Sequence, residues 1–185
     1  MKHQDLIRVA ISGSHATGKT TLVNDLSESL NRLGIKTNIA AEPIRLLDDT
    51  QANGNQADRF LRLLQIHFQR LSQEGCQCCI YDRSLLDFCV YLKVEGISLY
   101  SIYPLARELL PWYLPHFDAH IYLPIEFAMQ VDDKRPVSDS FRVAIDTEIG
   151  RLGRACEIDL QTITGSRRER TKKVIRLIQN IASSK

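Results

Sequence analysis

The chain has 185 residues, of which 44% are hydrophobic and 25% charged, and its 24 basic and 22 acidic residues give a net charge of +2. These are the proportions of an ordinary globular domain, and they exclude collagen-like, low-complexity and intrinsically disordered chains. At about 100–200 residues per domain, we expect one domain over residues 1–185. Because the charge is nearly balanced, nucleic acid is not an expected partner.

The amino-terminal segment has no apolar run long enough for a secretion signal, because Arg8 interrupts the stretch Leu6–Ile11. No stretch approaches the roughly 18 apolar residues of a membrane span. The five cysteines are an odd number, which argues against a disulfide framework. We therefore expect a cytoplasmic protein with no membrane partner. For Cys76, Cys78 and Cys79, which share an apolar run, we favour buried packing over zinc binding.

Predicted strands and helices alternate along the first half of the chain. Leucines at 22, 26, 30 and 33 share one helix face, and Gly34 follows at the position of a helix-ending glycine. The elements expected in chain order are a strand at Leu6–Ser12, this helix, a strand at Ile35–Ala41, a helix at Gln56–Glu74 closed by Gly75, a strand at Cys76–Tyr81 and a helix at Ser84–Val94.

The second half continues the alternation. An aromatic segment, Ile97–Phe117, contains three prolines and predicts short helices broken at them. There follow a strand at Ala119–Leu123, helices at Ile125–Val131 and Ser140–Cys156 around a polar loop, a strand at Asp159–Thr164, and a last helix that begins with a Ser166–Glu169 capping box. This order predicts a three-layer α/β fold, with a five-stranded parallel sheet covered by helices on both faces.

Residues Gly13-Ser14-His15-Ala16-Thr17-Gly18-Lys19-Thr20 match the Walker A pattern, between a predicted strand and a predicted helix. In such a P-loop, glycines let the backbone wrap an anion, and successive amides at the helix start bind phosphate oxygens. Lys19 is expected to reach the β- and γ-phosphates and Thr20 to bind Mg²⁺, with Thr21 also beside the nucleotide. The motif predicts a P-loop NTPase fold with ATP and Mg²⁺ as cofactors, and nothing in it separates ATP from GTP.

Charged residues follow three further predicted strands, at the sheet edge where parallel α/β proteins bind ligands. Glu42 is our candidate for the base that takes the proton of an acceptor hydroxyl, against the alternative of a carboxylate that caps the next turn. Asp82 is a candidate Mg²⁺ ligand. Arg83 is expected on the acceptor or its phosphate, against the alternative of a surface ion pair with Asp82.

The loop after the fourth strand carries two more arginines. Arg135 and Arg142 are expected to close over the triphosphate as an arginine-bearing lid, at about residues 132–142, and to stabilise charge on the moving phosphoryl group. The alternative is a solvated turn.

These motifs resemble those of the deoxynucleoside kinase and thymidylate kinase group of P-loop kinases. Glu42-Pro43 is similar to the Glu-Pro pair that supplies their base, and Asp82-Arg83-Ser84 to the acidic-Arg-Ser motif that binds magnesium and substrate. The chain looks closer still to the small AAA-type kinases related to ribosylnicotinamide kinase, whose Glu-x-x-Arg matches Glu42 to Arg45. It departs from them at Asp133, where their lid has glycine.

The resemblance also implies where an acceptor binds. Gln65 and Gln69 would line a pocket between their helix, which also carries Phe68, and the aromatic segment with Tyr100, Tyr103, Trp112 and Tyr113. Core packing of the aromatic residues is the alternative. Arg45 would join the substrate-binding residues.

The expected function is therefore transfer of the γ-phosphoryl group of ATP to a hydroxyl of a small nucleoside-like molecule. The protein could act as a monomer or as a homodimer. Ser84 stands where thymidylate kinases usually carry an aromatic residue, which favours a nucleoside over a monophosphate acceptor. A nucleoside monophosphate kinase, an ATP-binding regulatory module without transfer activity and a kinase that acts on nucleic acid through the basic residues of 167–173 stay open as alternatives.

Overall fold

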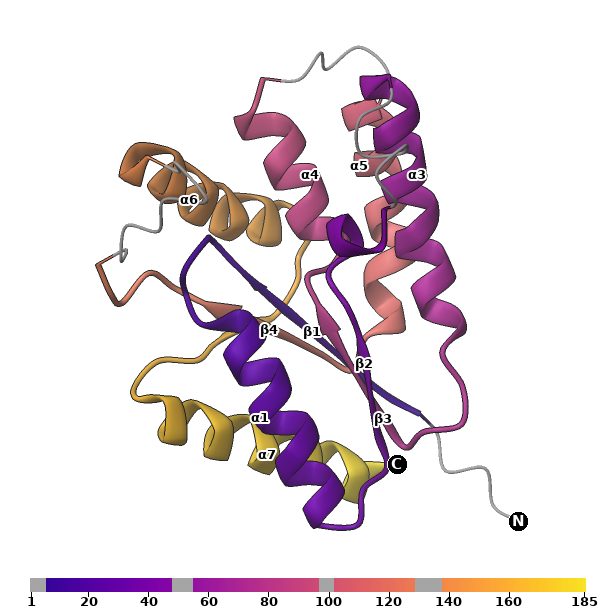
Figure 1. Cartoon of the computed structure of the whole chain (residues 1–185), viewed down its shortest axis with the longest axis vertical. Coiled ribbons are helices and arrows are strands. Elements are labelled where there is room, and N and C mark those ends of the chain that lie inside the picture. The colour runs from indigo at the N-terminus through magenta and orange to yellow at the C-terminus, as the bar shows by residue number, and fades with distance from the viewer. Residues whose placement is uncertain (1–5, 48–54, 97–101, 129–137) are drawn as a thin grey trace.

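The computed structural model describes residues 6–47, 55–96, 102–128 and 138–185, and a parallel sheet runs through its middle (Figure 1). The five strands lie in the order β2-β3-β1-β4-β5, and every neighbouring pair is parallel. The strands are β1 (Ile7–Gly13), β2 (Thr37–Ala40), β3 (Cys78–Asp82), β4 (Ala119–Leu123) and β5 (Leu160–Thr162). The predicted α/β class and the five parallel strands are confirmed.

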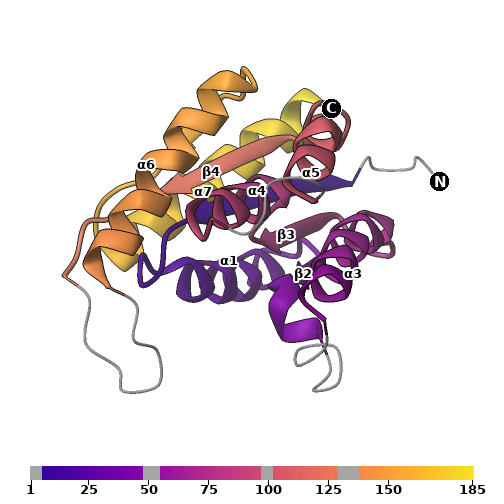
Figure 2. The ribbon, with the colours of Figure 1, turned by 90° about the horizontal axis from the view of Figure 1, so that it is seen from above.

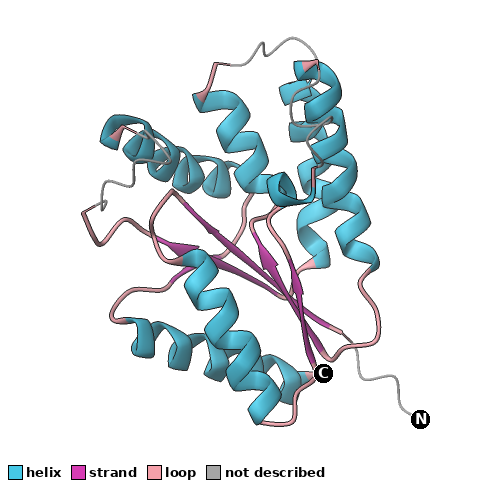
Figure 3. Ribbon diagram, viewed as in Figure 1, coloured by secondary structure: helices cyan, strands magenta, loops and turns pink. Residues whose placement is uncertain are grey.

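Helices cover both faces of the sheet, as Figures 1 and 3 show. On one face lie α1 (Lys19–Arg32) and α7 (Arg167–Ser184), which contact each other. The other face carries α3 (Gln56–Gln69), α4 (Leu85–Val94), α5 (Ile102–Tyr113) and α6 (Asp139–Ala155), with the short 3₁₀ helices η1 (Pro43–Leu46), η2 (Arg70–Ser72) and η3 (Leu114–His116) between elements. None of the helices in these ranges has both the length and the apolar character needed to cross a bilayer.

The strands divide their side chains between two cores, as the period of two in a strand requires. Figure 2 looks along the layers, with the sheet between its helices. In β3, Cys78 and Ile80 pack with α1 and α7, whereas Cys79 and Tyr81 pack with the helices of the opposite face. The two cysteines therefore face opposite cores, which is the buried packing favoured from the sequence. Burial raises the pKa of the Cys79 thiol to about 11, so the thiol is protonated at neutral pH.

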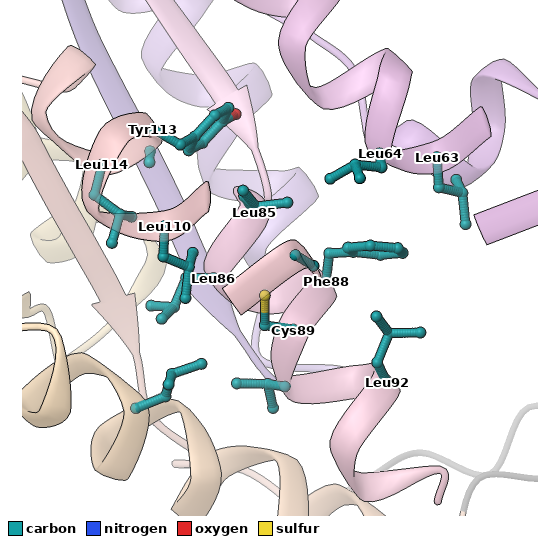
Figure 4. Packing of buried hydrophobic residues seen from close by; sticks show 14 of the residues in the cluster. Leu63, Leu64, Leu85, Leu86, Phe88, Cys89, Leu92, Leu110, Tyr113 and Leu114 are labelled. Carbon is teal, nitrogen blue, oxygen red and sulfur yellow. The ribbon is translucent and has the colours of Figure 1, made fainter. Parts of the chain in front are cut away.

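Helix α4 is the centre of the larger core. It is mostly apolar, and residues from Leu85 to Leu92 are all buried except Tyr91, which is partly buried. Such a helix must be covered all round. Figure 4 shows its side chains packed against Leu63 and Leu64 of α3 and against Leu110 and Tyr113 of α5. Because Ser84 caps this helix at the end of β3, the packing of α4 fixes the direction of the chain after the strand.

Two predictions of helical structure were wrong, although α5 does end just before Pro115, which lies in η3. Pro104 and Pro111 do not break the aromatic segment, because both lie within α5. Pro104 occupies the first turn, where amides have no partner in the helix, and the helix ends two residues after Pro111. The helix expected at Ile125–Val131 is absent from residues 125–128; there, the Phe127 carbonyl accepts a hydrogen bond from α6 and the Glu126 carboxylate binds Gly165.

Several local expectations are confirmed. Gly34 and Gly75 both have positive φ angles, of 81° and 73°, after the ends of α1 and η2. The capping box of Ser166 and Glu169 starts α7 with both of its hydrogen bonds formed.

Two buried tyrosines give a matched test of the core. The Tyr81 hydroxyl donates to the Arg70 carbonyl at 3.0 Å, whereas the Tyr113 hydroxyl is fully buried without a partner among the described residues. We expect Tyr81→Phe to lower the free energy of unfolding by about 0.5–1.5 kcal/mol and Tyr113→Phe to raise it by about 1 kcal/mol, because only the second change removes an unsatisfied group. Urea unfolding measures both, and destabilisation by Tyr113→Phe would contradict the assignment.

Candidate active site

The loop between β1 and α1 has the backbone of an anion-binding turn. Ala16 and Gly18 adopt positive φ angles of 53° and 87°, and Gly18 is the N-cap of α1, a helix of 14 residues. A Cβ on Gly13 would lie 2.7 Å from the Leu123 carbonyl oxygen, so only glycine fits where β1 passes β4. The loop therefore brings backbone amides and a helix N-terminus to one point, which favours a bound anion.

Two buried arginines hold this loop from behind. Arg142 of α6 donates through Nε to the His15 carbonyl at 2.8 Å and through Nη2 to the Phe127 carbonyl at 2.8 Å. Arg170 of α7 donates to the Thr17 carbonyl at 2.6 Å. Ser14 closes the contact with α6, because its hydroxyl donates to the Arg142 carbonyl at 2.7 Å.

The position of Arg142 corrects the expected lid. Residues 138–142 are the cap and first turn of α6 rather than a loop, and Arg142 is only 2% exposed. Its guanidinium donates to carbonyl groups and lies behind the P-loop. Because the side chain is buried in the packing of α6, it does not extend into solvent as a lid arginine would. Arg135, the other expected lid arginine, lies outside the described residues, as do residues 132–137 of the lid.

Lys19 is buried at the start of α1, with 6% of its surface exposed. Its Nζ donates to the Ser14 carbonyl and lies 3.4 Å from the Thr17 hydroxyl. Burial, helped by the positive charge of Arg83, lowers the pKa of Lys19 to about 7, although nearby carboxylates oppose this shift. A bound polyanion would favour the charged form of this ammonium group, so the site is electrostatically suited to phosphate.

Thr20 and Asp82 form a pair that fits a magnesium ion. The Thr20 hydroxyl donates to Asp82 Oδ2 at 2.9 Å, and Asp82 Oδ1 is buried without a partner among the described residues. A hydroxyl and a carboxylate oxygen are the hard donors that Mg²⁺ takes next to phosphates. The unpartnered oxygen is the observation that supports this fit, and both residues lie where the sequence predicted them.

Glu42 and Arg83 are joined across the ends of β2 and β3. Arg83 Nε donates to Glu42 Oε1 at 2.5 Å, and Arg45 Nε to Glu42 Oε2 at 3.2 Å. Burial by itself would raise the pKa of Glu42, but the charge and hydrogen bond of Arg83 outweigh it and leave the pKa below its usual value. The carboxylate makes no cap bond and Asp82 pairs with Thr20, so both alternative readings of these residues were wrong.

Arg83 owes its direction to an unusual backbone. Its φ angle is +68°, a left-handed conformation that costs a non-glycine residue about 1–2 kcal/mol. From this turn, Nη1 reaches back to the Gly13 carbonyl at 3.2 Å, and the guanidinium lies 4.8 Å from the centre of the Tyr91 ring. The side chain thus connects the loop after β1 with Glu42 after β2.

Asp87 is a site residue that sequence reasoning missed. It is 1% exposed and accepts hydrogen bonds from the Ser12 hydroxyl at 2.6 Å and the Ser84 amide at 3.0 Å. It also accepts from the Gly13 amide at 3.2 Å and lies 3.6 Å from Arg83 Nη1. Its signal was available, because Ser84 and Asp87 have the spacing of a capping box. Arg70, which holds the ends of β2 and β3, left no such signal.

Two cavities meet at Glu42 and Arg83. The first, here the loop cavity, has about 200 Å³ and is lined by residues of the P-loop with Glu42, Arg45, Asp82 and Arg83. The second, here the helix cavity, has about 230 Å³ and extends between α3 and α4. Among the described residues, His15, Glu42 and Arg83 are the ones that line both cavities. Thr21 lines the loop cavity as expected, and Arg45 lies on this side rather than in the helix cavity.

The helix cavity differs from the pocket inferred by resemblance. On α3 it is lined by Arg59, Phe60, Leu63 and His67, which share one helix face. Gln65 and Gln69 are exposed on the other side of this helix and line neither cavity. The helical period explains the error, because these glutamines lie two residues from the lining positions.

The described aromatic residues expected in that pocket line neither cavity, and Trp112 is 57% exposed. Tyr113 is fully buried, and the rings of Phe68 and Trp112 lie 5.5 Å apart. Tyr103 packs against the same core, and Tyr100 lies outside the described residues.

Comparison with known proteins supports the fold and the loop. A family model described as an AAA domain matches residues 8–170. No curated protein matches the sequence significantly. Among solved structures, the YorR protein of Bacillus subtilis in complex with phosphorylated GDP has a TM-score of 0.64 and 15% identity, over 93% of this chain and 95% of that one.

Deoxyadenosine kinase from M. mycoides is similar in the same way. Its structure with bound dATP gives a TM-score of 0.64 at 15% identity, over 94% of this chain and 100% of the kinase. Its structure with bound dCTP gives 0.60 at 18% identity, over 97% and 100%. At these identities the likeness establishes a shared fold, and the chemistry must be argued from the residues themselves.

The lowered pKa of Lys19 predicts a pH dependence of stability. Between pH 7 and 10.5 the unfolded chain holds this proton and the folded chain does not, so the free energy of unfolding should rise with pH by up to about 1.4 kcal/mol per unit. Urea unfolding at several pH values should show this rise in the parent protein relative to Lys19→Met. Lys36→Met, at an exposed position, controls for net charge, and equal slopes for the parent protein and Lys19→Met would refute the prediction.

Proposed function

We propose a phosphotransferase function for this chain, which belongs to the AAA domain family: it transfers the γ-phosphoryl group of ATP to a hydroxyl of a small nucleoside-like molecule. The observation that carries this proposal is the meeting of the two cavities at Glu42 and Arg83. A donor in the loop cavity and an acceptor in the helix cavity would have a carboxylate and a guanidinium between them. The similarity in fold to a deoxyadenosine kinase adds support. We propose one catalytic domain over residues 1–185.

Residues of the P-loop would bind the donor. The backbone amides from Ser14 to Thr20 would hold the β- and γ-phosphates, with the Lys19 ammonium group beside them. Thr20 and Asp82 would hold Mg²⁺, which when bound neutralises phosphate charge. A recess of about 130 Å³ beside the loop, lined by Thr21, Phe127 and Arg167 among others, offers space for the donor base.

Glu42 and Arg83 would carry the transfer step. As the oxygen of the acceptor hydroxyl bonds to the γ-phosphorus, Glu42 takes the proton of that hydroxyl. The bond from the γ-phosphorus to the bridging oxygen breaks, and ADP leaves with that electron pair. The low pKa of Glu42 keeps it ionised at neutral pH, while Arg83 neutralises charge on the transferred group.

The helix cavity suits a neutral planar acceptor. It follows α4 from Ser84 to Glu95, about 15 Å along the helix, with the rings of Phe60 and Phe88 in its wall. Arg59, whose charge acts on Glu95, lines it, and Arg59 Nε is buried without a partner among the described residues. A ring could pack between apolar side chains while a carbonyl or ring nitrogen at its edge binds Arg59. This is the chemistry of a nucleoside.

Glu42→Gln tests the transfer step. We expect turnover to fall by ~10²–10⁴ because the base is lost, with the Kd for ATP changed less than threefold. ADP release is measured with panels of nucleosides and nucleoside monophosphates, and calorimetry gives the Kd. Glu28→Gln, on the exposed side of α1, is the matched control.

The outcomes separate the candidate functions. Unchanged turnover in Glu42→Gln would exclude Glu42 as the base. Preference for monophosphates would favour a monophosphate kinase, and tight ATP binding without acceptor-stimulated ADP release would favour a regulatory module.

Arg59→Met tests the acceptor site. Loss of its hydrogen bond should raise KM for the acceptor about tenfold while leaving KM for ATP unchanged. Arg62→Met, on the same helix but outside the helix cavity, serves as the control. Steady-state kinetics with the best acceptor give both constants, and equal effects of the two changes would show that Arg59 does not select the acceptor.

A further inference from the structure

We propose that Arg70 is a positioning residue: by binding the carbonyl groups at the ends of β2 and β3, it fixes the turn that aims Arg83 at Glu42. The inference rests on the proposed function for its effect on turnover, but not for its effect on geometry. Arg70 lies in η2, before β3, and lines neither the loop cavity nor the helix cavity. Its action on the site would therefore pass through the backbone.

The guanidinium of Arg70 binds backbone carbonyls just beyond the point where the hydrogen bonds between β2 and β3 end. The pairing of β2 with β3 stops at Ala40 and Tyr81. Beyond that point, Arg70 Nη2 donates to the carbonyls of Ala40 at 2.7 Å and Asp82 at 3.0 Å, and Nη1 donates to the carbonyl of Arg83 at 3.1 Å. One side chain thus satisfies three carbonyl groups that the strands leave unpaired.

The third of these bonds acts on the left-handed turn at Arg83. The amide of Arg83 donates to the Ile11 carbonyl at 3.1 Å, and its carbonyl accepts from Arg70. Both polar groups of this strained residue are therefore held. Because the φ angle of +68° directs the side chain toward Gly13 and Glu42, releasing the carbonyl would free the turn to relax and the guanidinium to leave Glu42.

Arg70 is itself fixed and committed to this role. It is 4% exposed, its guanidinium lies 5.3 Å from the centre of the Tyr81 ring, and the Tyr81 hydroxyl donates to its carbonyl. It forms no ion pair within the described ranges. A planar guanidinium can donate from two nitrogens to three carbonyls, whereas a lysine ammonium in the same place is a point donor.

The test compares Arg70→Met and Arg70→Lys with Arg8→Met in the full chain. Arg8 is a matched control, because it donates to the neighbouring Leu71 carbonyl and acts on the same Tyr81 side chain, while none of its hydrogen bonds among the described residues goes to the carbonyls of Ala40, Asp82 or Arg83. Carbon-13 NMR of the glutamate carboxyl groups, with Glu42 assigned from Glu42→Gln, follows the titration of Glu42. The groups that act on Glu42 are Arg83, Lys19 and Arg45, and these variants leave all three in the sequence.

We expect the Glu42 titration to move up by at least one pH unit in Arg70→Met and by less in Arg70→Lys, and to stay in place in Arg8→Met. We also expect turnover to fall at least tenfold in Arg70→Met while the Kd for ATP changes less than threefold. A Glu42 titration unchanged in folded Arg70→Met would overturn the proposal, as would an equal shift in Arg8→Met. If Arg70→Met does not fold, Arg70→Lys decides by the same criteria.

A parent protein without acceptor-stimulated turnover would count against the proposed function alone. The Glu42 titration would still test Arg70, because it needs no substrate.

Discussion

Buried guanidinium groups that bind backbone carbonyls are the interaction on which the geometry of this site depends. The carboxyl ends of parallel strands leave carbonyl groups without partners, and buried ones must be satisfied. Arg142 and Arg170 bind carbonyls of the P-loop, and Arg70 binds those at the ends of β2 and β3. Each comes from an element outside the loop it holds, so the packing of the helices is transmitted to the site.

This arrangement separates arginines that hold backbone from arginines that face the cavities. Arg142 and Arg170 are nearly fully buried, and both donate to carbonyl or carboxylate groups. Arg83 does both, because it binds the Gly13 carbonyl with one nitrogen and Glu42 with another. Arg83 therefore links the position of the backbone to the position of the Glu42 carboxylate. Its left-handed backbone conformation is the strain that accompanies these two contacts.

The sequence was informative where function depends on local pattern. The P-loop, the Thr20–Asp82 pair and the meeting of Glu42 with Arg83 follow from motifs at strand ends, because parallel strands bring those ends to one edge. It was uninformative where function depends on which side of a helix faces inward. Gln65 looked suitable by residue type, yet Arg59 faces the cavity, and only tertiary packing of α3 decides between them.

The same reasoning explains why Arg142 misled the sequence analysis. Arg142 lies 19 residues beyond the end of β4 and next to a polar loop, a position typical of a lid, but the cap at Ser138 places it in the first turn of α6. From there its guanidinium donates to two backbone carbonyls, those of His15 and Phe127. An arginine near a phosphate site can therefore have either of two roles: it binds the ligand, or it binds the backbone that surrounds the ligand. Composition does not distinguish them, whereas the hydrogen bonds of Arg142 in the folded chain do.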